Sequence, residues 1–255
     1  GIETNKPEAI RVLTEKTKSE PEIQIFSLPT TYPQGAEKVL IYHTLGRTVM
    51  EGQLPADQGV IVMNVSSVAF LSRYLKTGMP MVQRMVTVDG DAVGKPCNVM
   101  VPMGTPVQDV LDFAQCDMER AKKVLYGGPM MGMAQYTADI PVAKGTGAML
   151  AFAGKEEQYE EHPQCIRCGK CVGVCPMRLE PVFMYKYLMK GDVDTWQNTL
   201  HGMDCIECGA CTYICPARLP LIHAFRMGKQ KVNNARMAAK AKAEAEKAAA
   251  EKKEA

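Results

Sequence analysis

The sequence predicts a mixed α/β (α+β) protein: a partial Rossmann-like layer, a β-grasp-like module and a helical cysteine-rich module. Strand and helix patterns alternate over residues 1–82, as in layers whose strands pair in parallel. Over residues 83–154, two strand patterns precede a short helix and further strands. Residues 155–230 carry two cysteine runs separated by helical patterns, and residues 231–255 are mostly alanine, lysine and glutamate. These four ranges are the predicted domains and tail.

The first layer opens with a helix predicted over residues 7–18, where Pro7 suits the first helical turn. Gly46 and Gly78 are expected to end two later helices, because glycine adopts the left-handed conformation that closes helices. The uninterrupted apolar run at 59–63 is typical of a buried strand. The other elements expected here are a strand at 23–28 and helices at 33–45 and 66–76.

The second module is predicted from short strand patterns around one helix. Asp89-Gly90-Asp91 is a turn signal between two strands, and Thr105-Pro106 precedes a helix. The expected elements are strands at 85–88, 98–102, 123–126 and 147–152 and a helix at 107–113. The glycine-rich stretch 126–132 lies between strands and opens no helix, so a turn is favoured over a phosphate-binding loop.

Two cysteine runs are the most specific feature of the chain. Each reads C-x2-C-x2-C-x3-C-P, the spacing of bacterial [4Fe–4S] sites. Gly169 and Gly209 follow the second cysteine of each run, where φ > 0 and a small residue suit a tight loop around a cluster. In two-cluster ferredoxins the fourth cysteine of a run serves the other cluster. The first cluster is therefore assigned to Cys165, Cys168, Cys171 and Cys215, and the second to Cys205, Cys208, Cys211 and Cys175.

Zinc and disulfides are the alternatives for these thiols. Structural zinc takes four ligands, usually from two separated pairs, whereas each run here has a third cysteine at i+6. Disulfides suit secreted chains, and the sequence opens on no signal peptide. Cys97 and Cys116 stand outside the runs and are expected to be small buried hydrophobes. The four histidines share no metal-binding spacing.

Helical patterns fill the 29 residues between Cys175 and Cys205, including a helix over 195–200, and a further helix is expected at 219–227. These inserted helices favour a helical two-cluster module over a compact ferredoxin. Trp196 is expected in its core, and residues 156–161 form an acidic linker before it. The Ala/Lys/Glu tail predicts a solvated, fraying helix or a disordered segment.

Composition narrows the classes of function. The net charge of +2 gives no electrostatic case for nucleic-acid binding. No apolar stretch reaches the roughly 18 residues of a membrane span, and the best candidate, 59–75, is interrupted by polar residues. A soluble protein that docks on other components is therefore expected.

The chain resembles the RnfC family, the peripheral subunits of Rnf ion-translocating electron-transport complexes, up to about residue 230. The resemblance is carried by both cysteine runs and by SLPTTYPQGAEK at 27–38, LPAD at 54–57, TVDGDAV at 87–93 and GGPMMG at 127–132. It implies a translocase that passes electrons between ferredoxin and NAD, with FMN and NAD(H) bound by a domain similar to the flavoprotein of complex I. The partners implied are membrane-bound Rnf subunits and a ferredoxin-linked carrier, at the cytoplasmic face of the inner membrane.

The resemblance also implies site residues and alternatives. Tyr32, Gly35, Glu37 and Asn64 fall where that flavoprotein lines its flavin and nucleotide site, although the sequence alone favours an exposed helix carboxylate for Glu37 and a strand-end cap for Asn64. The family's glycine-rich flavin loop has no counterpart here, so the chain is expected to lack the N-terminal part that holds FMN. Cobalamin reductases of the propanediol-utilisation type share this domain order, and a non-redox module with structural metal is a third reading.

Overall fold

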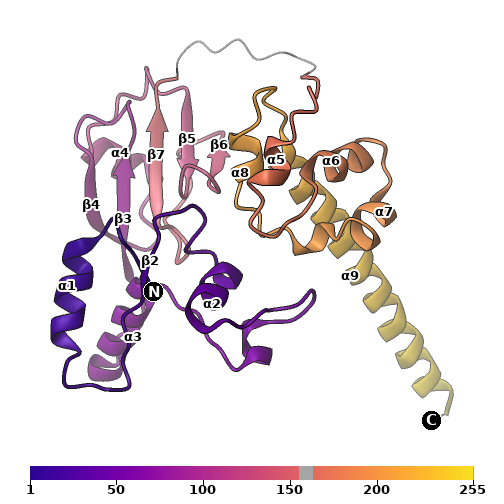
Figure 1. Cartoon of the computed structure of the whole chain (residues 1–255), viewed down its shortest axis with the longest axis horizontal. Coiled ribbons are helices and arrows are strands. Elements are labelled where there is room, and N and C mark those ends of the chain that lie inside the picture. The colour runs from indigo at the N-terminus through magenta and orange to yellow at the C-terminus, as the bar shows by residue number, and fades with distance from the viewer. Residues whose placement is uncertain (155–162, 255) are drawn as a thin grey trace. The chain divides into compact units, whose positions relative to one another are not determined.

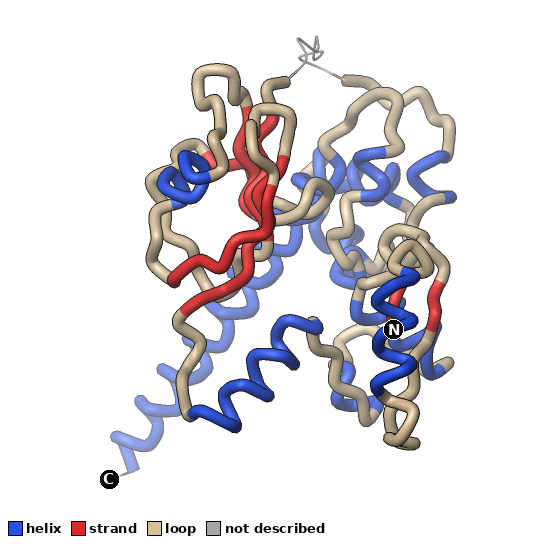
Figure 2. The backbone as a smooth tube through the Cα atoms, turned by 90° about the vertical axis from the view of Figure 1, so that its left-hand side faces the viewer, coloured by secondary structure: helices blue, strands red, loops and turns tan. Residues whose placement is uncertain are grey.

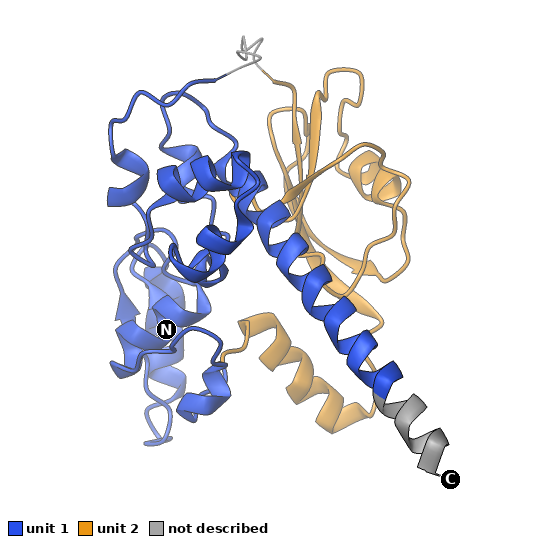
Figure 3. Cartoon of the chain, turned by 90° about the vertical axis from the view of Figure 1, so that its right-hand side faces the viewer, with its two compact units in different colours: residues 1–61, 161–255 blue, residues 62–160 orange. Residues whose placement is uncertain are grey.

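The computed structural model describes residues 1–154 and 163–254, with side chains up to residue 246. These residues form two compact units, the first made of residues 1–61 with 161–255 and the second of residues 62–160 (Figure 3). The acidic linker predicted at 156–161 lies outside the described residues.

The second unit is built on a five-stranded mixed sheet with the strand order β4-β3-β7-β5-β6 (Figure 1). Its strands are β3 (Gln83–Asp89), β4 (Cys97–Pro102), β5 (Lys123–Tyr126), β6 (Met133–Gln135) and β7 (Ala148–Phe152). β3 pairs antiparallel with β4 and parallel with β7, and β5 pairs antiparallel with β6 and β7. The strand patterns do not predict β6, which has only three residues. The glycine-rich stretch before it is a turn, as expected.

One helix, α4 (Val107–Phe113), covers a face of this sheet (Figure 2). Val86 and Val88 alternate inward along β3 and are fully buried against Leu111 of the helix. This alternation is the period-2 pattern of a strand with one covered face. Cys97 and Cys116 pack against the same core as small hydrophobes, but they are only partly buried and not fully buried as expected.

Gly90 permits a close approach between the β3 turn and β7, and its replacement gives a testable stability effect. Its φ is 128°, and a Cβ at this position would collide with the backbone carbonyl of Ala151. We expect Gly90→Ala to lower the free energy of unfolding of the second unit by about 2 kcal/mol or more, because backbone cannot yield as a side chain does. Thermal unfolding of the full chain measures this loss, with Gly128→Ala as a control at an open position. Equal stability of the two variants would contradict the expectation.

The apolar run at 59–63 is not the buried strand predicted from the sequence. Residues 60–64 have no regular structure, and Ile61 is 82% exposed. A strand needs a neighbour for its backbone groups, and no described strand pairs with this run. The helix after it, α3 (Val65–Thr77), does form, and Gly78 ends it with φ of 68° as expected.

The N-terminal part of the first unit contains one short parallel pair, β1 (Ile2–Glu3) with β2 (Ser27–Leu28). The helices are α1 (Pro7–Lys16) and α2 (Glu37–Leu45), followed by the 3-10 turn η1 (Pro55–Gln58). The strand predicted at 23–28 is therefore reduced to its last two residues. The predicted helix start at Pro33 is also wrong, because Ala36 has an extended backbone and α2 begins after it.

The helical module of the first unit surrounds a core centred on Trp196. Trp196, Met184 and Phe225 are all at most 1% exposed, which confirms the core position predicted for the tryptophan. The elements are α5 (Lys170–Gly173), α6 (Pro181–Met189), α7 (Val193–Asn198), η2 (Gly202–Asp204), α8 (Ala210–Tyr213) and α9 (Leu221–Glu254). The helix predicted at 195–200 is thus α7, two residues earlier.

The last helix is longer than the sequence pattern predicts. The helix expected at 219–227 and the Ala/Lys/Glu tail form one continuous α9 (Figure 1). Exposed ion pairs one helical turn apart, Lys240–Glu244 and Lys242–Glu246, add slight support to its outer part. Within the described ranges, no helix is both long enough and apolar enough to cross a membrane.

Candidate iron–sulfur sites

The two cysteine motifs fold into loops of the same backbone conformation. Gly169 and Gly209 adopt left-handed φ values of 73° and 79° and precede the four-residue helices α5 and α8. Arg167 and Glu207, at corresponding positions, have φ of 58° and 56°. The predicted need for positive φ at both glycines is confirmed, and the motifs are a repeated structural unit.

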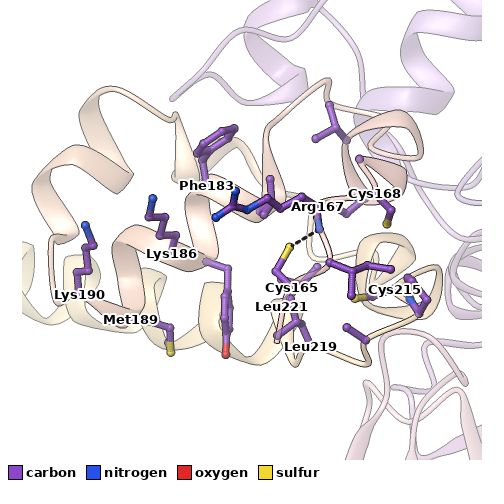
Figure 4. Close-up of a pocket in the computed structure, with 18 residues that line it drawn as sticks. Cys165, Arg167, Cys168, Phe183, Lys186, Met189, Lys190, Cys215, Leu219 and Leu221 are labelled. Atoms are coloured by element: carbon purple, nitrogen blue, oxygen red, sulfur yellow. Dashed lines mark hydrogen bonds between the residues drawn. The ribbon is translucent and has the colours of Figure 1, made fainter. Parts of the chain in front are cut away.

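The four thiols assigned to the first cluster line one cavity of about 890 Å³ (Figure 4). Three come from the first motif, namely Cys165, Cys168 and Cys171, and Cys215 comes from the end of the second. Cys165 and Cys168 are exposed to solvent, and the other two are partly buried. The first site is therefore an open one.

The four thiols assigned to the second cluster line a much smaller cavity of about 20 Å³. Cys205, Cys208 and Cys211 come from the second motif, and Cys175 is the fourth cysteine of the first. Cys208 and Cys211 are buried and the remaining two are partly buried. The structure thus brings the cysteines together in the two sets of four that the spacing suggested.

Burial dominates the electrostatics of the thiols. Burial, with a smaller contribution from the neighbouring cysteines, raises the pKa of Cys205 to about 11 and that of Cys211 to about 12. Burial also raises the pKa of Cys171 and Cys208. These raised pKa values keep the thiols protonated at neutral pH when no iron is bound, so iron must displace their protons when a cluster is inserted.

The donor set fits a cubane cluster. Backbone N–H groups already point at cysteine sulfurs: that of Arg167 donates to Cys165 Sγ and that of Leu179 to Cys175 Sγ, each at 3.4 Å. In the described part of the chain, no three His, Cys, Asp or Glu side chains gather closely enough to hold one metal ion. Thiols that line a cavity without converging on one point suit a cluster, because each thiolate binds a different iron. The ten cysteines, all described, form no disulfide.

The second site is joined to the N-terminal segment by polar contacts that the sequence patterns did not predict. The Tyr32 hydroxyl donates a 2.6 Å hydrogen bond to the Cys208 carbonyl. Lys38 pairs with Asp204 at 3.2 Å, next to the second motif. Burial, and to a lesser extent the neighbouring Cys208, raises the pKa of Tyr32, so its hydroxyl stays a donor. These contacts fix the N-terminal segment beside the second site.

The Tyr32 contact gives a second stability prediction. Tyr32→Phe removes one hydrogen bond and leaves the Cys208 carbonyl without this donor, so we expect the free energy of unfolding to fall by about 1 kcal/mol. Chemical denaturation under anaerobic conditions measures it. Tyr42→Phe is a matched control, since no hydrogen bond from that hydroxyl to a described residue is present and the side chain is 58% exposed. A loss as large in the control would show that the Cys208 contact contributes nothing.

The residues suggested for flavin and nucleotide binding are exposed and divided between the two units. Tyr32, Gly35 and Glu37 are exposed in the first unit, where Glu37 begins α2. Asn64 is exposed in the second unit, and its side chain caps α3 by accepting from the Ser66 N–H at 2.9 Å. Flavin pockets bury most of their ligand. Within each unit taken by itself, these exposed residues do not enclose a flavin.

Comparison with protein-family models places known domains along the chain. The Nuo51 FMN-binding domain matches residues 1–73, the SLBB domain residues 85–134 and the 4Fe-4S dicluster domain residues 157–216. The SLBB match confirms the β-grasp prediction, and the dicluster match covers both cysteine motifs.

Comparison with individual proteins identifies the homologues of this chain. The chain is 42% identical over 232 residues, 91% of its length, to the RnfC-type subunit of the Na⁺-translocating ferredoxin:NAD⁺ oxidoreductase complex of Acetobacterium woodii. It is 42% identical to the proton-translocating counterpart of Clostridium ljungdahlii over 71% of its length. It is 39% identical to the counterpart in the ion-translocating oxidoreductase complex of Salmonella arizonae over 96% of its length. This chain is a homologue of RnfC.

The homology to RnfC extends beyond the cysteine motifs into all three matched domains. The chain spans 52% of the Acetobacterium protein, 39% of the Clostridium protein and 36% of the Salmonella protein. The resemblance inferred from the quoted motifs is thereby confirmed.

The sequence patterns did not predict two features of the charged residues in the RnfC-like cluster module. The charged residues that line the first cavity are all basic, namely Arg167, Lys186 and Lys190. The corresponding position of the second motif holds an acid, Glu207, which pairs with two cations. Comparison of the two motifs, C-I-R-C and C-I-E-C, carried a signal of this difference.

Proposed function

We propose that this chain relays single electrons through two [4Fe–4S] clusters as a subunit of an Rnf-type ion-translocating oxidoreductase complex. The observation that carries the proposal is the division of eight thiols into two sets of four, each lining its own cavity. The homology to RnfC supports the assignment to such a complex.

In the proposed ligand sets, the fourth cysteine of each motif binds the cluster of the other motif. Cys165, Cys168, Cys171 and Cys215 would hold the first cluster, and Cys205, Cys208, Cys211 and Cys175 the second. A bound [4Fe–4S] cluster accepts and releases one electron at a time. The protein would contribute backbone N–H groups that donate to the sulfurs, and the buried second site would have a low dielectric. Cys171 and Cys175 serve different clusters, so the short stretch of chain between them would join the two clusters covalently. No proton need move with the electron.

The flavin side of the reaction would use the domain that the Nuo51 FMN-binding model matches. We infer that FMN and NAD(H) bind the domain to which residues 1–82 belong, with Tyr32, Gly35 and Glu37 contributing to that site. Residues 83–154 would form the SLBB-like domain, 155–230 the dicluster domain and 231–255 a tail. The match of the Nuo51 FMN-binding domain to residues 1–73 supports this division.

The proposed complex would pass electrons between ferredoxin and NAD and couple them to ion translocation, as the names of the relatives state for those proteins. Its membrane-bound subunits and a ferredoxin-linked carrier would be the partners, and the chain would lie at the cytoplasmic face of the cell membrane. By itself, this chain would act as an electron carrier.

The test is to purify the chain without oxygen and to measure iron, acid-labile sulfide and the EPR spectrum after reduction with dithionite. We expect about eight iron and eight sulfide per chain and the interacting signals of two reduced clusters. Stoichiometric zinc, or iron near zero in a well-folded chain, would overturn the electron-transfer function.

A further inference from the structure

We infer that the open face of the first site, around Arg167, Lys186 and Lys190, is the docking surface for an acidic protein that carries a one-electron redox centre. This inference rests on the proposed function, because the docked partner would exchange electrons with the first cluster. It goes further by naming the surface and the chemistry of the partner.

The face combines exposed apolar side chains with basic ones. Ile166 is 66% exposed, Phe183 46% and Met189 57%, and all three line the cavity beside the thiols. Lys186 and Lys190 are exposed on α6 and at its end, one turn apart. Apolar and aromatic residues with a charged rim are typical of protein-docking surfaces, and small encounters of this kind are common between electron carriers.

Figure 4 shows how these side chains are arranged around the thiols. The amines of Lys186 and Lys190 point to the same side of α6, and the Arg167 guanidinium extends toward that helix. The charged residues that line the cavity include no acid. None of the three cations has an ion pair with a described residue, since Lys190 makes only a ring contact, 6.0 Å from the Tyr187 centroid. The positive charge of this face is therefore available to a partner.

The second site differs from the first in how its charged residues are paired. Glu207 occupies the position of Arg167 in the repeat and pairs with Arg226 at 3.2 Å and Lys229 at 3.1 Å. The Lys229 amine also donates to the carbonyl of Cys205. Both cations are thus engaged by Glu207 within the chain, and the segment containing Tyr32 and Lys38 already contacts this site. The two described sites share the same loop conformation. Of these two, only the first has exposed thiols beside cations without an ion pair.

The difference between the two sites indicates the order in which electrons would pass through the two clusters. The segment containing Tyr32 and Lys38 belongs to the FMN-binding domain match and lies beside the second site, so the second cluster would exchange electrons on the flavin side. The first cluster would exchange them with the docked carrier: one electron leaves one centre as the other gains it, and no bond forms or breaks. Unpaired basic residues around an exposed redox site would attract an acidic carrier and orient it.

The test measures binding of a small acidic two-[4Fe–4S] ferredoxin to the cluster-loaded chain by calorimetry at low and at moderate salt. For Lys186→Glu with Lys190→Glu, we expect the affinity to fall by about tenfold or more and its salt dependence to weaken, because two attractions become repulsions. The matched control is Lys240→Glu with Lys242→Glu, which makes the same change in net charge on exposed residues of α9. The control should bind as the unaltered chain does.

Electron exchange supplies a second readout. In stopped-flow experiments, reduction of the clusters by the reduced ferredoxin should slow in the Lys186/Lys190 variant, whereas reduction by the methyl viologen radical cation should not. Equal binding by both double variants, or no salt-sensitive binding by the unaltered chain, would overturn the docking surface. Iron and sulfide contents measured on the same samples separate this outcome from failure of the proposed function, since absent clusters would overturn the latter.

Discussion

Cys175→Ala combined with Cys205→Ala should leave about four iron per chain, whereas Cys175→Ala combined with Cys165→Ala should leave almost none. The first pair removes two ligands of the same cluster, because both thiols line the smaller cavity. The second pair removes one ligand from each cluster, because Cys165 lines the larger cavity. This is the largest effect expected of any substitution in the chain, and iron and sulfide analysis measures it directly.

EPR distinguishes the two variants further. The first should show the isolated signal of one reduced cluster, without the splitting that two interacting clusters produce. Cys215→Ala with Cys165→Ala is the reciprocal variant and should also retain about four iron. If the motifs instead bound their own fourth cysteines, Cys175→Ala with Cys165→Ala would retain one cluster, and the crossed assignment would fail. Cys97 lines neither cavity, so Cys97→Ala is the control for iron lost during purification.

Gly202→Ala should be the most destabilising small substitution in the helical module. A Cβ on Gly202 would collide with the six-membered ring of Trp196, which is fully buried. The indole has no room to move, because it packs within the core that contains Met184 and Phe225. Overpacking of this kind costs about 1–3 kcal/mol, and we expect the upper end here because an entire ring must shift. The midpoint of thermal unfolding of the anaerobic holoprotein measures the loss.

Gly228→Ala provides a graded comparison. Its Cβ would lie 2.9 Å from the end of the Leu188 side chain and 3.3 Å from Trp196, contacts that a small rotation of leucine relieves. Alanine also favours the α9 helix by up to about 1 kcal/mol over glycine. The midpoint should therefore change little, and far less than in Gly202→Ala. A fall of similar size in both variants would show that the tightness around Trp196 does not control the stability of the module.

Local chemistry explains why much of the fold could be predicted from the sequence. Gly46 and Gly78 end their helices in the left-handed conformation because glycine has no Cβ to oppose it. The strand of 123–126 and the helix of 107–113 have the predicted bounds, since alternating or helically spaced apolar residues face one core. The run at 59–63 shows the limit of such patterns. Apolar character favours a buried strand only where the tertiary structure supplies a neighbouring strand.

The sequence by itself determined the chemistry of the candidate sites, because cysteine spacing and glycine position are local properties that select a cluster-binding loop. It suggested the crossed ligand sets as well, and the structure gathers the thiols in those sets. Only the tertiary structure decided what surrounds each set. It enclosed the second beside Tyr32 and paired Glu207 with cations from α9, and it left the first open beside Lys186 and Lys190. Burial and ion pairing depend on residues distant in sequence, so two nearly identical motifs acquire different surroundings.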